Sequence, residues 1–154
     1  TWGHFTDTET GYGVYLFNVH LDHQSQPSRE KSVALLMQRA AERPIAADPV
    51  IVTGDFNADE ENAAIQFMKG QALVDGVSNP LPLVDSFRSL YPDETQVRTG
   101  HSFNGGTDGP KIDFVFMGPG QIALAAEIDH SNTDGRYPSD HFPVTATLQL
   151  PALP

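Results

Sequence analysis

The segment Pro49–Val52 constrains the fold most strongly, because it is short, apolar and largely β-branched. Such a run is typical of a buried strand. The sequence before it predicts a helix over residues 28–43, which Ser28 can cap and Pro44 ends. Its apolar residues repeat with helical spacing: Val33, Leu36, Met37, Ala40 and Ala41. A helix with one apolar face is expected to pack on the sheet that contains the strand.

The rest of the chain predicts more strands than helices. Strands are expected at about residues 1–6, 13–20, 49–53, 100–103, 111–117, 121–128 and 142–149. A second helix is predicted from a cap at Asp59 to Gly70, and a short helical stretch over Leu83–Leu90. Helices that alternate with strands, followed by a strand-rich end, indicate a layered α/β fold of the α+β type with a mixed sheet. Residues 1–150 are predicted to form one unit, with 151–154 as a tail.

Charge and composition argue against several classes of protein. Nine Lys and Arg residues against twenty Asp and Glu give a net charge of -11, and the cationic residues form no cluster. This argues against a DNA-binding surface built on phosphate contacts. The absence of cysteine excludes disulfides and thiolate chemistry. No apolar run of eighteen or more residues occurs, so we predict no membrane span. Nothing in the sequence predicts a subcellular location.

Four segments place polar residues inside or beside apolar strands: NVHLDH (18–23), TGDFNA (53–58), KIDFVF (111–116) and YPSDHFPV (137–144). Side chains alternate along a strand, so Asn18, His20 and Asp22 share one face while His23 lies on the other. This arrangement disfavours a zinc site built from His20 and His23. In the second segment, Asp55 and Asn57 also share a face.

The third and fourth segments predict a carboxylate paired with an imidazole. Asp140 and His141 are neighbours and diverge if the chain is extended, so another carboxylate should orient His141. Asp113 lies in an apolar run, where an unpaired charge would cost several kcal/mol. It is predicted to pair with His141, and Lys111 is the alternative partner. An Asp–His pair fixes the imidazole tautomer and raises its basicity, as a general base requires.

Each of the four segments, taken singly, also has an ordinary structural interpretation as a turn, a cap or a satisfied core residue. Their joint occurrence at strand ends of one α/β domain indicates an active site. Together they resemble the motifs of the endonuclease/exonuclease/phosphatase superfamily, which includes pancreatic-type deoxyribonucleases. The resemblance covers nearly the whole chain. It implies a four-layer α/β sandwich of two mixed sheets between helices, with the active site at one rim.

The resemblance also implies that residues 1–150 are the C-terminal portion of such a domain. The principal metal-binding Glu of the family is then expected upstream of Thr1. The N-terminal half would be a separate chain, or a second copy of this chain would cover the sheet face that the missing half leaves open. Without such a partner, the fragment would expose a broad apolar surface.

The catalytic residues that the resemblance implies are His20, Asp55, Asn57, Asp113 and His141. Asp55 would orient or deprotonate the attacking water, and Asn57 would hold a phosphate oxygen. His141, oriented by Asp113, would contact the phosphoryl group as a base or an electrostatic stabiliser. His20 would contact the phosphate or assist the leaving group.

Phosphate binding is predicted for four residues: Asn18, His20, Asn57 and Arg136. Arg136 is included among the phosphate-binding residues only because a guanidinium binds phosphate well. The alternative interpretation is that Arg136 is a solvated loop residue. Asp140 matches a position near the divalent cation, and oxygen ligands favour Mg²⁺ or Mn²⁺. The predicted function is a metal-dependent phosphoesterase. The alternatives are a nuclease acting on DNA or RNA and a non-catalytic binding fragment.

Overall fold

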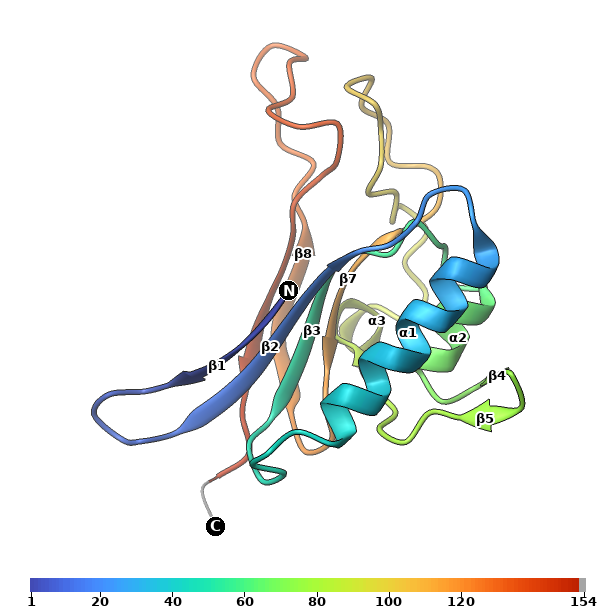
Figure 1. The fold of residues 1–154 in the computed structure, drawn as a ribbon. Helices are drawn as coiled ribbons and strands as arrows, with labels where there is room; N and C mark the ends of the chain where they lie inside the picture. Colours follow the sequence, from blue (N-terminus) through green and yellow to red (C-terminus); the bar gives the residue numbers. More distant parts are fainter. Residues whose placement is uncertain (153–154) are drawn as a thin grey trace.

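The computed structural model describes residues 1–152 (Figure 1). Its elements in chain order are β1 (Trp2–Thr6), β2 (Gly13–His20), α1 (Gln26–Ala41), β3 (Val50–Asp55), α2 (Ala63–Met68), β4 (Leu73–Val74), β5 (Val77–Ser78), β6 (Val84–Asp85), α3 (Ser86–Leu90), β7 (Asp113–Met117), β8 (Ile122–Ile128) and β9 (Val144–Gln149). Five strands form a sheet in the order β1-β2-β3-β7-β6, in which only β2 and β3 are parallel. The predicted α/β fold with a mixed sheet is therefore confirmed.

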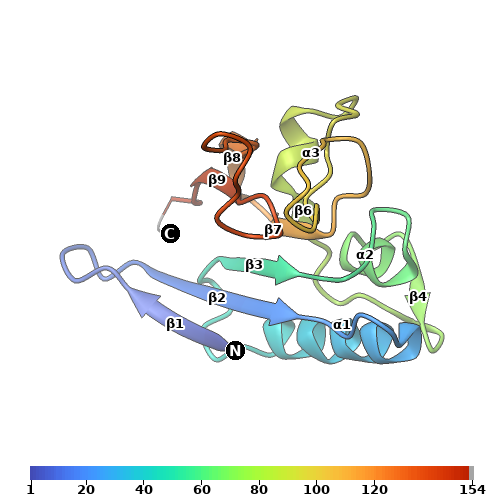
Figure 2. The ribbon, with the colours of Figure 1, turned by 90° about the horizontal axis from the view of Figure 1, so that it is seen from above.

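The five-stranded sheet has helices on one face and a strand pair on the other. Helices α1 and α2 cover the first face, whereas β8, β9 and α3 lie on the opposite side (Figure 2). The core between the sheet and the helices includes Phe17, Val52, Phe114 and Phe116 from the strands and Met37 from α1, all buried. Phe56, at the end of β3, meets Phe114 and Phe116 edge to face and closes this core at the end of the sheet where β3 terminates.

Helix α1 keeps the predicted apolar face but begins earlier than predicted. Its N-cap is Ser25, whose side chain accepts a hydrogen bond from the backbone N–H of Ser28, and a proline occupies the first turn. The predicted residues Val33, Leu36, Met37 and Ala40 are all buried. Helix α2 also starts at a different cap. Asn62 accepts from the N–H of Ala64, and Asp59 forms a turn instead.

Two other predicted elements need correction, and one hairpin is additional to the prediction. No strand forms over residues 100–103, where Ser102 and Phe103 have positive φ values of 52° and 63° and only Gly100 makes an isolated bridge. The stretch 83–90 begins as β6 and becomes helical only at Ser86. The β4–β5 hairpin was not predicted, although its turn residues Asp75 and Gly76 adopt φ values of 49° and 78° that favour such a turn.

The chain beyond β9 has no regular structure over residues 151–152, and residues 153–154 of the predicted tail lie outside the described residues. The carbonyl of Pro151 accepts a hydrogen bond of 2.6 Å from the hydroxyl of Tyr12. No helix within residues 1–152 has the length and apolar character needed to cross a membrane.

The sheet face opposite α1 is apolar at one end and polar at the other. Leu16, Ile51 and Met117 lie in register across β2, β3 and β7, and two residues further along come Asn18, Thr53 and Val115. Leu16, Ile51 and Val115 are only half-buried. Phe5 on β1 points to the same side and is 56% exposed. This face therefore carries apolar side chains that the described residues cover only in part.

Candidate active site

A row of three ionisable side chains marks the polar end of that sheet face. The register pairs His20 of β2 with Asp55 of β3, and Asp55 with Asp113 of β7. Gly54 makes this alignment possible, because its φ is +137° and a Cβ there would collide with the carbonyl oxygen of Val19. A residue with a side chain would push β2 and β3 apart at this point. The glycine in TGDFN thus explains how the two polar strand ends come together.

The pair of His141 and Asp113 is present as predicted. His141 Nδ1 lies 2.8 Å from Asp113 Oδ2, and both side chains are half-buried. Burial opposes the charged imidazole, but the hydrogen bond and the charge of Asp113 outweigh it and raise the pKa of His141 above 6.5. The alternative partner for Asp113 was wrong, because Lys111 lies 2.6 Å from Asp85 instead.

Asn57 holds the carboxylate of Asp55 in place. One carboxylate oxygen accepts from the backbone N–H of Asn57 at 2.7 Å, and the other lies 3.3 Å from Asn57 Nδ2. Asn57 has a φ of 47° and also donates from Nδ2 to the carbonyl of Leu21. In this arrangement Asn57 orients Asp55 and fastens the end of β3 to the loop after β2.

The side chains of β2 extend the row toward solvent. His20 is 77% exposed, and its Nε2 lies 3.4 Å from Asp55 Oδ2. Asn18 shares the same strand face and lines a cavity together with Asp55. Asp22 serves the chain locally, because its carboxylate accepts from the backbone N–H groups of Gln24 and Ser25 ahead of α1.

A cavity of about 470 Å³ lies over this row. The polar residues that line it are Asn18, Thr53, Asp55, Asp113, Ser139 and His141. Four predicted site residues do not line it: His20, Asn57, Arg136 and Asp140. Arg136 lies in an exposed loop, with its guanidinium 3.9 Å from Asp134. Asp140 is exposed, and its backbone carbonyl accepts from the N–H groups of His101 and Ser102.

One group of side chains within residues 1–152 could hold a metal ion. Asp55, Asp113 and His141 each offer a ligand atom, and these atoms all lie within 4.8 Å of one another. Two carboxylates and one imidazole fit a cation such as Mg²⁺ or Mn²⁺, with water or substrate filling the other positions. Neither His20 nor His23 belongs to this group.

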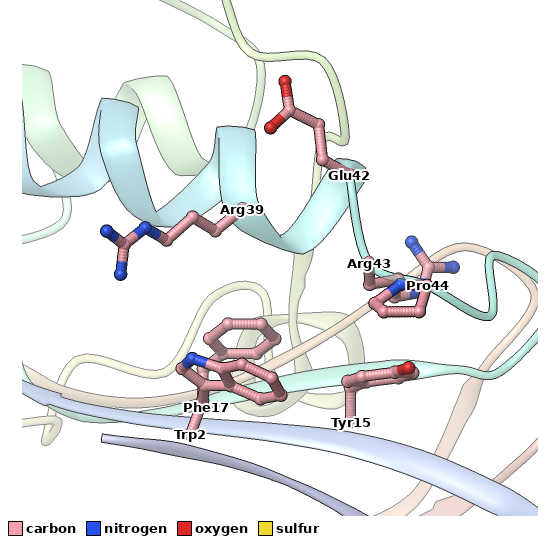
Figure 3. Close-up of a pocket in the computed structure, with 7 residues that line it drawn as sticks. All are labelled: Trp2, Tyr15, Phe17, Arg39, Glu42, Arg43 and Pro44. Carbon is pink, nitrogen blue, oxygen red and sulfur yellow. The ribbon is translucent and has the colours of Figure 1, made fainter.

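A second cavity, of about 300 Å³, lies between α1 and the β1–β2 pair. The aromatic side chains of Trp2, Tyr15 and Phe17 point from the strands toward the helix that carries Arg39 (Figure 3). The second arginine that lines this cavity, Arg43, donates to the backbone carbonyls of Ala40, Ala46 and Asp48. The carboxylates and imidazoles of the candidate site do not line this cavity, and we assign it no catalytic role.

Two residues that sequence reasoning missed contact the His141–Asp113 pair. The hydroxyl of Ser139 accepts from the backbone N–H of His141 at 3.2 Å. Thr99 is fully buried, and its hydroxyl oxygen accepts from the N–H of Asp113 at 3.1 Å. Ser139 lies within YPSDHFPV and could have been found as part of that motif, whereas no pattern in the sequence marks Thr99.

The fold and the site together define the class of protein. Two carboxylates at the ends of neighbouring strands, one of them paired with a loop histidine, are suited to acid–base hydrolysis. The sequence matches the profile of the Endonuclease/Exonuclease/phosphatase family over residues 3–141, so the chain belongs to that family. A comparison with curated protein sequences found no match.

Solved structures of similar fold support this assignment. An endonuclease/exonuclease/phosphatase from Bacteroides vulgatus superposes with a TM-score of 0.78 at 27% identity, over 97% of this chain and 54% of that one. A mannosyl-6-phosphatase from Bacteroides thetaiotaomicron gives 0.73 and 27%, over 97% and 56%. The human Nocturnin catalytic domain with bound sulfate gives 0.71 at 20% identity, over 96% and 51%, which shows the fold alone. The chain spans about half the length of these structures.

Proposed function

We propose that this chain provides the acid–base half of a divalent-metal-dependent phosphoesterase, which hydrolyses a phosphate ester by attack of water on phosphorus. The observation that carries the proposal is the half-buried group of Asp55, Asp113 and His141 on one cavity. Family membership supports the same reaction class, because the family includes phosphatases, nucleases and phosphodiesterases.

The side chains of this group and their neighbours on β2 have roles that their positions suggest. The hydrogen bond between Nδ1 of His141 and Asp113 leaves Nε2 of His141 free to exchange a proton with the phosphoryl oxygens or with the attacking water. Asp55, fixed by Asn57, would orient that water. His20, beside Asp55 and open to solvent, would reach the phosphate or the leaving group. Asn18, on the same strand face, would donate to a phosphate oxygen.

Asp55 and Asp113 carry the carboxylates that would hold Mg²⁺ or Mn²⁺. Asp140 is the further oxygen ligand that the family motif suggests, although it does not line the cavity. A cation bound there neutralises charge that develops on the phosphate oxygens during attack. Two or three protein ligands leave room for the substrate and for water, which Mg²⁺ sites usually retain.

We favour a small phosphate ester as the substrate class. The net charge of -11 supports this preference, because nucleic-acid binding draws on Lys and Arg contacts to phosphates. The likeness to a mannosyl-6-phosphatase at 27% identity also supports a sugar phosphate. Arg136 is available as an exposed cation that could meet a phosphate from the loop. A nuclease acting on DNA or RNA is the second candidate, favoured only by family membership.

Replacing Asp55 with alanine is expected to lower turnover at least about 100-fold, because the carboxylate that would orient the attacking water is removed. The assay uses mannose-6-phosphate, a chromogenic phosphodiester and plasmid DNA, each with Mg²⁺, with Mn²⁺ and with a chelator. The matched control is Asp48→Ala, which removes a carboxylate paired with His4 outside the site. Turnover that persists in the chelator or in Asp55→Ala would contradict the proposal. No turnover with any substrate, in a protein that also contains the residues that complete the site, would favour a binding fragment.

We further propose that residues outside this chain cover the open sheet face and complete the site. The half-buried Leu16, Ile51 and Val115, with the exposed Phe5, support this, because soluble monomers rarely expose broad apolar patches. The occupant that we favour is the other half of the same domain, since the solved structures contain nearly as much chain again beyond the matched part.

Sedimentation velocity on the 154-residue chain tests this coverage. We expect self-association that weakens in Leu16→Lys, because the charged side chain makes burial of that face costly. A concentration-independent monomer would show that the face needs no cover. Discrete dimers that Leu16→Lys dissociates would instead favour a second copy as the occupant.

A further inference from the structure

Thr99 lies between the two segments that carry the His141–Asp113 pair, and we propose that it is a positioning residue for that pair. It lies on the loop after α3, in a region without a sequence motif, and its side chain is 0% exposed. His141 and Asp113 are 28 positions apart in the sequence. A residue that forms hydrogen bonds to the segment of Asp113 and to the segment of His141 can therefore set the relative position of the two.

The hydroxyl of Thr99 holds the Asp113 side of the pair. Its oxygen accepts from the backbone N–H of Ile112 at 3.0 Å and from that of Asp113 at 3.1 Å. Both acceptor sites of the hydroxyl are thus occupied. Asp113 is the first residue of β7, so these bonds fix the point from which its carboxylate leaves the strand. The carbonyl of Ile112 in turn accepts from Phe56, the residue after Asp55.

The backbone of Thr99 holds the His141 side. Its carbonyl accepts from the N–H of Phe142 at 2.8 Å, and the next residue, Gly100, pairs with His141 in an isolated bridge. A Cβ on Gly100 would lie 3.5 Å from both Cε1 and Nε2 of the His141 ring, so the ring rests against this backbone. Thr99 therefore clamps the start of β7 through its side chain, and through its main chain it clamps the segment that carries His141.

A purely structural role for Thr99 would change stability alone, whereas a positioning role also changes the hydrogen bond between His141 and Asp113. Thr99→Val keeps the shape but removes the acceptor oxygen. Thr99→Ser keeps the oxygen and removes the methyl group. The catalytic meaning of the clamp rests on the proposed phosphoesterase function, but the hydrogen bond itself can be measured without turnover.

The first experiment follows the imidazole of His141 by ¹⁵N NMR at one fixed alkaline pH, where the ring is neutral. We expect wild type and Thr99→Ser to keep the proton on Nδ1, and Thr99→Val to exchange that proton with water at least about tenfold faster. Val33→Ala, a cavity variant in the buried face of α1, is the control for lost stability and should leave the signal unchanged.

A folded Thr99→Val protein with wild-type exchange would overturn the proposal, as would an equal change in Val33→Ala. If Thr99→Val does not fold, the Thr99→Ser variant decides between the two roles. This variant keeps the hydroxyl oxygen, so a changed Nδ1 signal would contradict a clamp made by that oxygen. In kinetics, Thr99→Val should lower kcat at least about tenfold and alter KM less than about twofold, with recovery in Thr99→Ser. A wild-type protein that contains the residues completing the site and still shows no turnover would count against the phosphoesterase, and the NMR result would then decide the clamp.

Discussion

Replacing Asp113 with asparagine is expected to lower kcat by about 10²- to 10⁴-fold in the proposed phosphoesterase reaction. The amide carries no charge to stabilise the imidazolium that forms at His141 after proton transfer. It can also turn its NH₂ group toward Nδ1, which favours the tautomer with the proton on Nε2. Steady-state kinetics with the substrate that gives metal-dependent turnover measure this loss.

The pH profile separates this effect from a general loss of structure. The pKa of His141 is raised above 6.5 by Asp113, and a general base acts in its neutral form, so the rate should rise as the pH passes through that raised pKa. In Asp113→Asn the rising limb should move to lower pH. The control is Asp48→Asn, which alters the 2.6 Å pair with His4 and should change neither kcat nor the profile. An unmoved limb in Asp113→Asn would contradict the assigned pairing.

Replacing Lys111 with methionine is expected to lower the free energy of unfolding by about 3–5 kcal/mol. Lys111 is 1% exposed, with its ammonium 2.6 Å from Asp85 Oδ2 and 3.3 Å from the centre of the Phe114 ring. Burial lowers the pKa of Lys111, against the influence of Asp85. Methionine fills a similar volume above the ring but leaves the buried carboxylate of Asp85 without its cation. Urea unfolding followed by circular dichroism measures the loss.

A second substitution identifies the unpaired charge as the cause. Asp85 also caps α3, since its Oδ1 accepts from the N–H of Phe87 at 3.0 Å. Asparagine keeps that acceptor, so adding Asp85→Asn to Lys111→Met should restore at least about half of the lost stability. Additive losses in the double variant would show that the two side chains are not coupled. Glu60 remains paired with Arg88 at 2.6 Å in either case.

The paired site residues could be predicted because their signals are local. Strand alternation separated His141 from its neighbour Asp140, and the apolar run around Asp113 required a partner for that carboxylate. The helical spacing of Val33 and Met37 likewise depends only on nearby residues. By contrast, Ser25 and Ser28 are equally suitable caps, and the turn built on Asp22 decides between them.

Other features depend on contacts between distant segments, which no local pattern records. Thr99 acquires its role only when Asp113 and Phe142 come to it from later parts of the chain. The sequence predicts a strand over residues 100–103, and the positive φ values of Ser102 and Phe103 exclude it. Residue type alone predicts phosphate binding by Arg136, but its side chain is 81% exposed and does not line the cavity over Asp55.

The register that aligns His20, Asp55 and Asp113 also limits how this sequence can change during evolution. Alternate residues point to opposite faces, so one residue inserted into or deleted from β3 or β7 would turn a carboxylate toward the helices and an apolar side chain toward the cavity. Apolar positions on these strands can exchange one residue for another without this consequence. We therefore expect homologous sequences to differ in length in the exposed loops, such as the one that carries Arg136, and to keep the number of residues in β3 and β7 unchanged.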